Sequence, residues 1–156
     1  MTFATAWAAL LGNEGGYTVD NGGPTNWGVT EAVARRHGYL GDMKDLPQST
    51  AENIAKVDYW DPYHCDQLPD ALAFQVLDAA YNGGPVVRWL QQAAETTVDG
   101  DFGPKTLSAI LAMEEWRMLM RFNAMRLRYM ASLVIWPTYG KGWANRIANN
   151  LMRAAQ

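Results

Sequence analysis

The sequence has a single cysteine, Cys65, so no disulfide can form within the chain. Packing and hydrogen bonds must hold the fold together, as is usual for a protein made in the cytosol. His64 precedes Cys65, but neighbouring residues rarely face each other and no third group supports the pair, so we expect a structural thiol. His37 is the only other histidine, and neither histidine has metal-ligand spacing. With no phosphate-binding glycine loop either, we expect no metal and no cofactor.

Long apolar runs and a basic leader are also missing. The longest candidate, residues 130–137, is far too short to cross a membrane. The first residues carry no positive charge, unlike a secretory signal. We therefore expect a soluble protein made in the cytoplasm without stable membrane insertion. It would need separate, holin-type release to act in the periplasm.

Apolar residues are plentiful and charged residues are few, at 49% and 19%, which suits one packed domain of residues 1–156. The charge is uneven: residues 1–87 carry four basic and eleven acidic side chains, whereas residues 88–156 carry nine and five. The basic part either attracts an anionic partner or simply complements the acidic part in the fold.

Helical spacing of apolar residues runs through most of the chain and predicts an all-α, or mainly α, fold. Expected helices begin at Thr2, Thr30, Ser49, Asp70, Pro85 and Pro104, followed by a long helix over 114–135 and a last one that contains Trp143. Thr2 can cap the first helix, and residues 49–52 form a capping box. Gly38 and Gly83-Gly84 are expected to end helices. Residues 17–29 differ, because they are rich in Gly, Asn and Thr and predict a small β-hairpin.

Four arginines lie on the long helix. Arg117, Arg121 and Arg128 share one face, which predicts an exposed basic stripe able to contact an anionic cell surface. Arg126 projects into the apolar side, where an unpaired charge is very costly. We expect a buried salt bridge from Arg126, with Asp78 as the first candidate partner; the alternative is a side chain that extends to solvent.

Glu14 is the next position on the apolar stripe of the first helix, where Gly15-Gly16 ends it. Burial there would raise the pKa of a carboxyl group and let it donate a proton, as glycosidic bond cleavage requires. The alternative is a helix-end glutamate that reaches water. Asp20 is the nearest carboxylate that could hold a water on the opposite face of a sugar, although it is equally suited to a plain turn.

Several motifs, in order along nearly the whole chain, resemble glycoside hydrolase family 108, a family of muramidases found among phage endolysins and secretion-associated lysozymes. They are EGGYTVDNGGPTNWGVT (14–30), YWDPYHCDQLP (59–69), LDAAYNGGP (77–85), VDGDFGPKTL (98–107), RLRYMASL (126–133) and WPTYGKGWANRI (136–147). The hairpin is shorter than usual in that family, so the resemblance alone identifies no counterpart for Asp20.

The resemblance implies a lysozyme-like helical domain with the hairpin beside the active site and Glu14 as the catalytic acid. It implies a catalytic half over 1–88 and a helical half over 89–156 that resembles a peptidoglycan-binding region. Asp20 and Thr30 are the further catalytic candidates. The substrate-binding candidates are Tyr17, Thr25, Asn26, Trp60, Tyr81 and Asn82.

The expected function is therefore that of a monomeric, phage-type lysozyme (an endolysin) for host-cell lysis, which hydrolyses the β-1,4 bond between N-acetylmuramic acid and N-acetylglucosamine in peptidoglycan and binds no nucleic acid. Two alternatives stay open. One is a non-catalytic peptidoglycan-binding protein, and the other is a lytic transglycosylase or chitinase on the same scaffold. The aromatic candidates for sugar stacking each have a competing role in the core.

Overall fold

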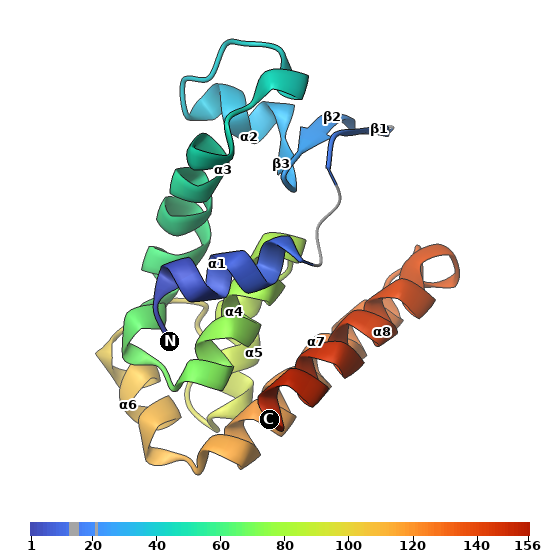
Figure 1. Ribbon diagram of the computed structural model, residues 1–156. Coiled ribbons are helices and arrows are strands. Elements are labelled where there is room, and N and C mark those ends of the chain that lie inside the picture. The colour runs from blue at the N-terminus through green and yellow to red at the C-terminus, as the bar shows by residue number, and fades with distance from the viewer. Residues whose placement is uncertain (13–15, 21) are drawn as a thin grey trace. The chain divides into compact units, whose positions relative to one another are not determined.

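The structure is a computed structural model that describes residues 1–12, 16–20 and 22–156. It is mainly α-helical with one small antiparallel sheet, as predicted (Figure 1). The chain forms two compact units, Met1–Asp66 and Gln67–Gln156, and each is described by itself. No helix within the described ranges is both long enough and apolar enough to span a membrane.

The first unit opens with helix α1, Phe3–Leu11. The Thr2 side chain accepts a hydrogen bond from the Thr5 backbone N–H, which is the predicted N-cap. Ala6, Trp7 and Leu10 form the buried stripe of this helix. Phe3 stacks on Trp7 and meets the edge of Trp60, with ring centroids 5.5 Å apart in the second pair.

Three short strands follow: β1 (Thr18–Asp20), β2 (Gly23–Asn26) and β3 (Val29–Thr30), in that order across the sheet. The predicted hairpin is confirmed, and β3 is an addition to it. Trp27 and Gly28 form the β2–β3 turn with φ of 54° and 78°. Left-handed backbone is costly for tryptophan, and a hydrogen bond from Trp27 Nε1 to the Leu46 carbonyl oxygen, at 2.9 Å, offsets that cost.

Short helices complete this unit. Helix α2 (Glu31–Arg36) is capped by Thr30 and stops before Gly38, whose φ is +83°, as predicted. The 3-10 turn η1 (Met43–Asp45) follows. Helix α3 (Gln48–Ala55) begins one residue before the expected Ser49, after Pro47, and has no side-chain cap. The predicted capping box at Ser49 is therefore wrong, because the helix begins upstream of it. Helix α3 continues into η2 (Lys56–Trp60) and η3 (Asp61–Tyr63). After His64, whose φ is 50°, the turn η4 (Cys65–Gln67) follows.

The second unit consists of helices α4 (Asp70–Asn82), α5 (Val86–Ala93), α6 (Pro104–Ala112), α7 (Glu115–Ser132) and α8 (Trp136–Ala154). Every residue of α4 from 72 to 80 is buried, so α4 is the central helix of this unit. Helices α7 and α8 pack on each other, and both contact α4. Helix α8 contains Trp143, as predicted, and its first turn contains Pro137.

Candidate active site

The register of the small sheet sorts the predicted site residues onto two faces. Thr18 pairs with Thr25, and Thr25 pairs with Thr30. Side chains of directly paired residues lie on the same face of an antiparallel sheet. Three threonine hydroxyls, which we call the threonine face, therefore line one side of the sheet. Thr18 and Thr30 are exposed and Thr25 is half-buried, so this side is accessible.

Asn26 lies on the opposite side of the sheet, in register with buried Val29. Its Nδ2 donates to the carbonyl oxygens of Met43 and Lys44, at 2.8 and 3.2 Å. The side chain is only 5% exposed. Its amide N–H groups thus hold β2 to η1, and the structure separates Asn26 from Thr25 and Thr30, with which the sequence motif groups it.

Tyr17 precedes β1 and is 37% exposed. The Lys44 ammonium lies over its ring, 5.6 Å from the centroid, which is a cation–π geometry. Turn η1 therefore contacts both Tyr17 and Asn26, and it helps to hold the sheet and the tyrosine together.

Two carboxylates of the predicted site remain untested. Glu14 lies outside the described residues, between α1, which ends at Leu11, and β1, which begins at Thr18. The backbone of Asp20 ends β1 opposite Gly23, but its carboxylate lies outside what the structure describes. Thr30 is described in full, and its hydroxyl oxygen accepts the Val33 backbone N–H at 3.4 Å to cap α2.

Trp60 belongs to the core. Its side chain is 0% exposed, and its Nε1 donates to the Asp66 carboxylate at 2.9 Å. A ring with no free face cannot stack on a sugar, so this placement argues against the predicted substrate contact. Tyr81 is half-buried and Asn82 is exposed, both in the last turn of α4 in the second unit.

Cys65 is buried, at 1% exposure. Burial raises the pKa of its thiol far above the usual range, and the nearby carboxylates of Asp66 and Asp61 add to the shift. A neutral, buried thiol is a poor nucleophile, which agrees with the structural role expected for it. The described residues contain no cluster of three or more His, Cys, Asp or Glu side chains that could bind a metal ion.

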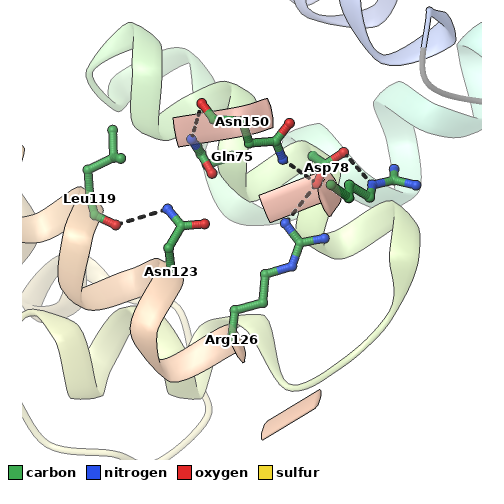
Figure 2. A network of polar contacts seen from close by, with 7 residues as sticks. Gln75, Asp78, Leu119, Asn123, Arg126 and Asn150 are labelled. Atoms are coloured by element: carbon green, nitrogen blue, oxygen red, sulfur yellow. Dashed lines mark hydrogen bonds and ion pairs between the residues drawn. The ribbon is translucent and has the colours of Figure 1, made fainter. Parts of the chain in front are cut away.

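A buried polar network in the second unit surrounds Asp78 (Figure 2). Arg126 Nη1 donates to Asp78 Oδ2 at 2.7 Å, and both side chains are 0% exposed. The predicted salt bridge is thus confirmed. Two partners were not expected: Arg146 Nε donates to Oδ1 at 2.8 Å, and Asn150 Nδ2 donates to Oδ2 at 2.7 Å.

The same network is incompletely satisfied. Among the described residues, Arg126 Nε and Nη2 are buried without a hydrogen-bond partner, as are Gln75 Oε1 and Asn123 Oδ1. Burial lowers the pKa of Arg126, and the Asp78 carboxylate opposes that shift. Asp78 ties α4 to α7 and α8, so it organises the second unit.

Residues 98–103 of the VDGDFGPKTL motif form a loop that is held from inside by Gln91, and the rest of the motif begins α6. Gln91 is 0% exposed, and its Nε2 donates to Asp99 Oδ1, the Asp101 carbonyl oxygen and Thr106 Oγ1, at 2.6, 3.1 and 3.1 Å. Its Oε1 accepts the Gly100 backbone N–H at 2.9 Å. Sequence analysis missed Gln91, because a glutamine in an amphipathic helix gives no sign that it is buried.

The predicted exposed basic stripe is only partly present. Arg121 is half-buried, donates to the Ala93 carbonyl oxygen at 2.7 Å and pairs with Glu95 at 3.1 Å. Arg117 also reaches Glu95, at 3.5 Å. Arg128 is exposed and, within the described part of the chain, makes no hydrogen bond or ion pair. Glu95 thus offsets much of the charge that was assigned to the stripe.

Comparison with known proteins defines the class. A family profile described as glycosyl hydrolase 108 matches residues 7–84, and one described as a predicted peptidoglycan domain matches residues 85–148. The solved structure of Brucella abortus SagA is 33% identical, with a TM-score of 0.89, over 98% of this chain and 93% of that one. Comparison with curated proteins gives no match.

These matches identify a glycoside hydrolase directed at peptidoglycan. The chain belongs to the glycosyl hydrolase 108 family, as its motifs suggested. The first profile contains the second half of α1, the sheet and Glu14, whereas the second contains the Gln91-centred loop and helices α5 to α7.

Proposed function

We propose that the protein is an N-acetylmuramidase that hydrolyses the β-1,4 bond between N-acetylmuramic acid and N-acetylglucosamine. Glu14 is the general acid, and it protonates the oxygen of the leaving sugar as the bond breaks. The observation that carries the proposal is the family match over residues 7–84, within which Glu14 begins the Glu-Gly-Gly-Tyr motif.

The threonine face supplies the second part of the mechanism. Thr30 accepts the cap hydrogen bond of α2 through its oxygen, so its hydroxyl proton remains available to a water or a sugar. Thr25 lies beside it in register, and Thr18 extends the row. We assign the positioning of the attacking water to Asp20 or Thr30. If Asp20 is the base of an inverting reaction, its carboxyl group should lie ~6.5–9.5 Å from that of Glu14.

Glu14→Gln tests the acid directly. The amide has nearly the same shape but cannot donate the proton, and loss of general acid catalysis typically costs ~10²–10⁴-fold in rate. The measurement is the release of reducing ends from purified sacculi, with circular dichroism as the folding control. A variant that keeps more than about a tenth of wild-type activity would contradict the assignment.

The same digests identify the bond and the water-positioning group. Mass spectrometry should find reducing N-acetylmuramic acid, whereas an anhydro product would indicate a lytic transglycosylase. Thr30→Asn keeps an N-cap residue but removes the hydroxyl. If Thr30 positions the water, this variant should melt like wild type and lose activity, and Thr30→Ser should keep activity. Loss in Asp20→Asn alone would assign the role to Asp20.

A further inference from the structure

Helices α5 and α7 line an open pocket of about 430 Å³ within the second unit. The α5 side contributes Pro85, Arg88, Trp89 and Gln92, which are spaced as one helical stripe. The α7 side contributes Met125, Arg128 and Tyr129, again spaced as one stripe. The two helices pack directly on each other, so the two stripes form opposite walls. The volume is within the range of small-ligand sites.

The pocket has a positive charge that nothing in its lining offsets. Arg88 and Arg128 both line it, and none of the lining residues is acidic. Arg88 donates to the backbone oxygens of Val98 and Asp99, at 3.4 and 3.3 Å, and it also interacts electrostatically with the Asp99 carboxylate, which is outside the pocket lining. Arg128 makes no hydrogen bond or ion pair within the described residues. Guanidinium groups bind carboxylates with two parallel N–H donors, so an anionic group with planar oxygens is complementary to this wall.

The rest of the pocket lining includes two aromatic side chains and one amide side chain. Tyr129 is 38% exposed and packs on buried Trp89, with ring centroids 5.3 Å apart. Trp89 is held in turn by close approach to Gly84, where a Cβ atom would lie 2.4 Å from the indole ring. Neither the Gln92 side chain nor the Tyr129 hydroxyl makes a hydrogen bond within the described residues. Both are thus available to a peptide group.

We infer that this pocket binds a free carboxylate of the acidic peptide stem of peptidoglycan. Arg128 supplies the charge, Gln92 and Tyr129 supply hydrogen bonds to the peptide, and Trp89 forms the apolar floor. The inference rests on peptidoglycan being the substrate, and it adds a site for the peptide to a reaction that takes place on the glycan. Binding the peptide away from the cleaved bond would favour wall polymer over unsubstituted glycan.

The test is calorimetric titration of the full chain with a single disaccharide–peptide that carries free stem carboxylates. Its matched partner has every carboxylate amidated. In this disaccharide, N-acetylglucosamine is linked through its C1 to N-acetylmuramic acid. The proposed reaction cleaves the other linkage, from C1 of N-acetylmuramic acid, so it does not consume the ligand. Wild type should bind the free form more tightly. Arg128→Gln should weaken that binding about five- to tenfold, as expected for one charge-assisted contact in a partly exposed site.

The controls separate a specific contact from general charge. Arg128→Lys should recover part of the affinity. Lys105→Gln removes one exposed cation elsewhere in the same unit and should bind like wild type. Amide chemical shifts of the wild-type protein should change at Gln92, Arg128 and Tyr129, which locates the ligand without any variant.

Three results would overturn the inference: no binding by wild type, equal binding of the amidated ligand, or an Arg128→Gln variant that binds like wild type. Each leaves the proposed hydrolysis untouched, because that depends on Glu14. Conversely, full activity in Glu14→Gln would remove the catalytic proposal while Arg128-dependent binding still supported the pocket.

Discussion

At the scale of single residues, the buried polar network of the second unit depends on Asp78 as its shared acceptor. Two arginines and one asparagine donate to its carboxylate, and Asp78, Arg126 and Asn150 are buried almost completely. Removing one donor and removing the shared acceptor should therefore have different effects on stability. Removing Arg126 leaves the carboxylate paired with Arg146, whereas removing the carboxylate leaves Arg126 charged, buried and without an anion.

This asymmetry gives a stability prediction. Asp78→Asn should lower the free energy of unfolding by about 3–5 kcal/mol, because it leaves buried guanidinium charge uncompensated. Arg126→Met should cost less, since two of its nitrogens are already without partners. Denaturant unfolding of both variants measures the difference. Asp78→Leu combined with Arg126→Met should recover only part of the loss, because Arg146 and Asn150 also lose their acceptor. A larger loss in Arg126→Met than in Asp78→Asn would contradict this account.

At the scale of elements, the loop between α5 and α6 depends on one carboxylate. The Asp101 backbone N–H donates to Asp99 Oδ1 at 2.9 Å, and Gln91 Nε2 donates to the same oxygen. These hydrogen bonds lower the pKa of Asp99, the backbone bond having the larger effect. The loop in turn places Pro104 at the first position of α6.

The lowered pKa of Asp99 sets the direction of a pH effect. A depressed pKa contributes stability above the unfolded value of ~3.9, and that contribution is lost as pH falls through the folded pKa. Asp99→Asn cannot ionise, so its melting temperature should fall below that of wild type at pH 7 and the gap should narrow below about pH 4. Thermal melts across this range measure the gap. Asp101→Asn, in the same loop, is the control. A difference in melting temperature between wild type and Asp99→Asn that does not change with pH would contradict the prediction.

At the scale of the whole molecule, the two compact units differ in charge. Residues 1–66 carry four basic and nine acidic side chains, and residues 67–156 carry nine and seven. The excess of positive charge in residues 67–156 is therefore two, and Glu95 locally offsets part of the charge of Arg117 and Arg121. Arg88 and Arg128 are the cations left to line a pocket on this unit.

The affinity for purified sacculi should therefore depend on salt concentration, and only a few arginines should account for that dependence. We expect affinity to fall as ionic strength rises from about 0.01 to 0.15 M, over which the screening length shortens from ~30 to ~8 Å. At low salt, Arg128→Gln should weaken binding, whereas the double variant Arg117→Gln, Arg121→Gln should change it little. Sedimentation assays with sacculi measure both. If the double variant weakened binding more than Arg128→Gln does, the predicted stripe of Arg117, Arg121 and Arg128 would be the contact surface instead.

Local signals in the sequence were enough for several features. Thr2 and Thr30 cap helices, Gly38 and Gly83 end them, and Pro104 begins one, because capping and backbone preferences act within a single turn. The hairpin followed from its turn residues. The salt bridge between Arg126 and Asp78 was also predictable, since a charge on an apolar helix face must find a partner.

Tertiary structure alone decided which polar groups act together. The sheet register puts Thr25 between Thr18 and Thr30 and sends Asn26 to the buried face, although all four lie in one short segment. Packing placed Trp60 and Gln91 inside, and brought Arg146 and Asn150 to Asp78 across about 70 residues. Residue type states what a side chain can bond, whereas register and packing determine which groups come within reach of it.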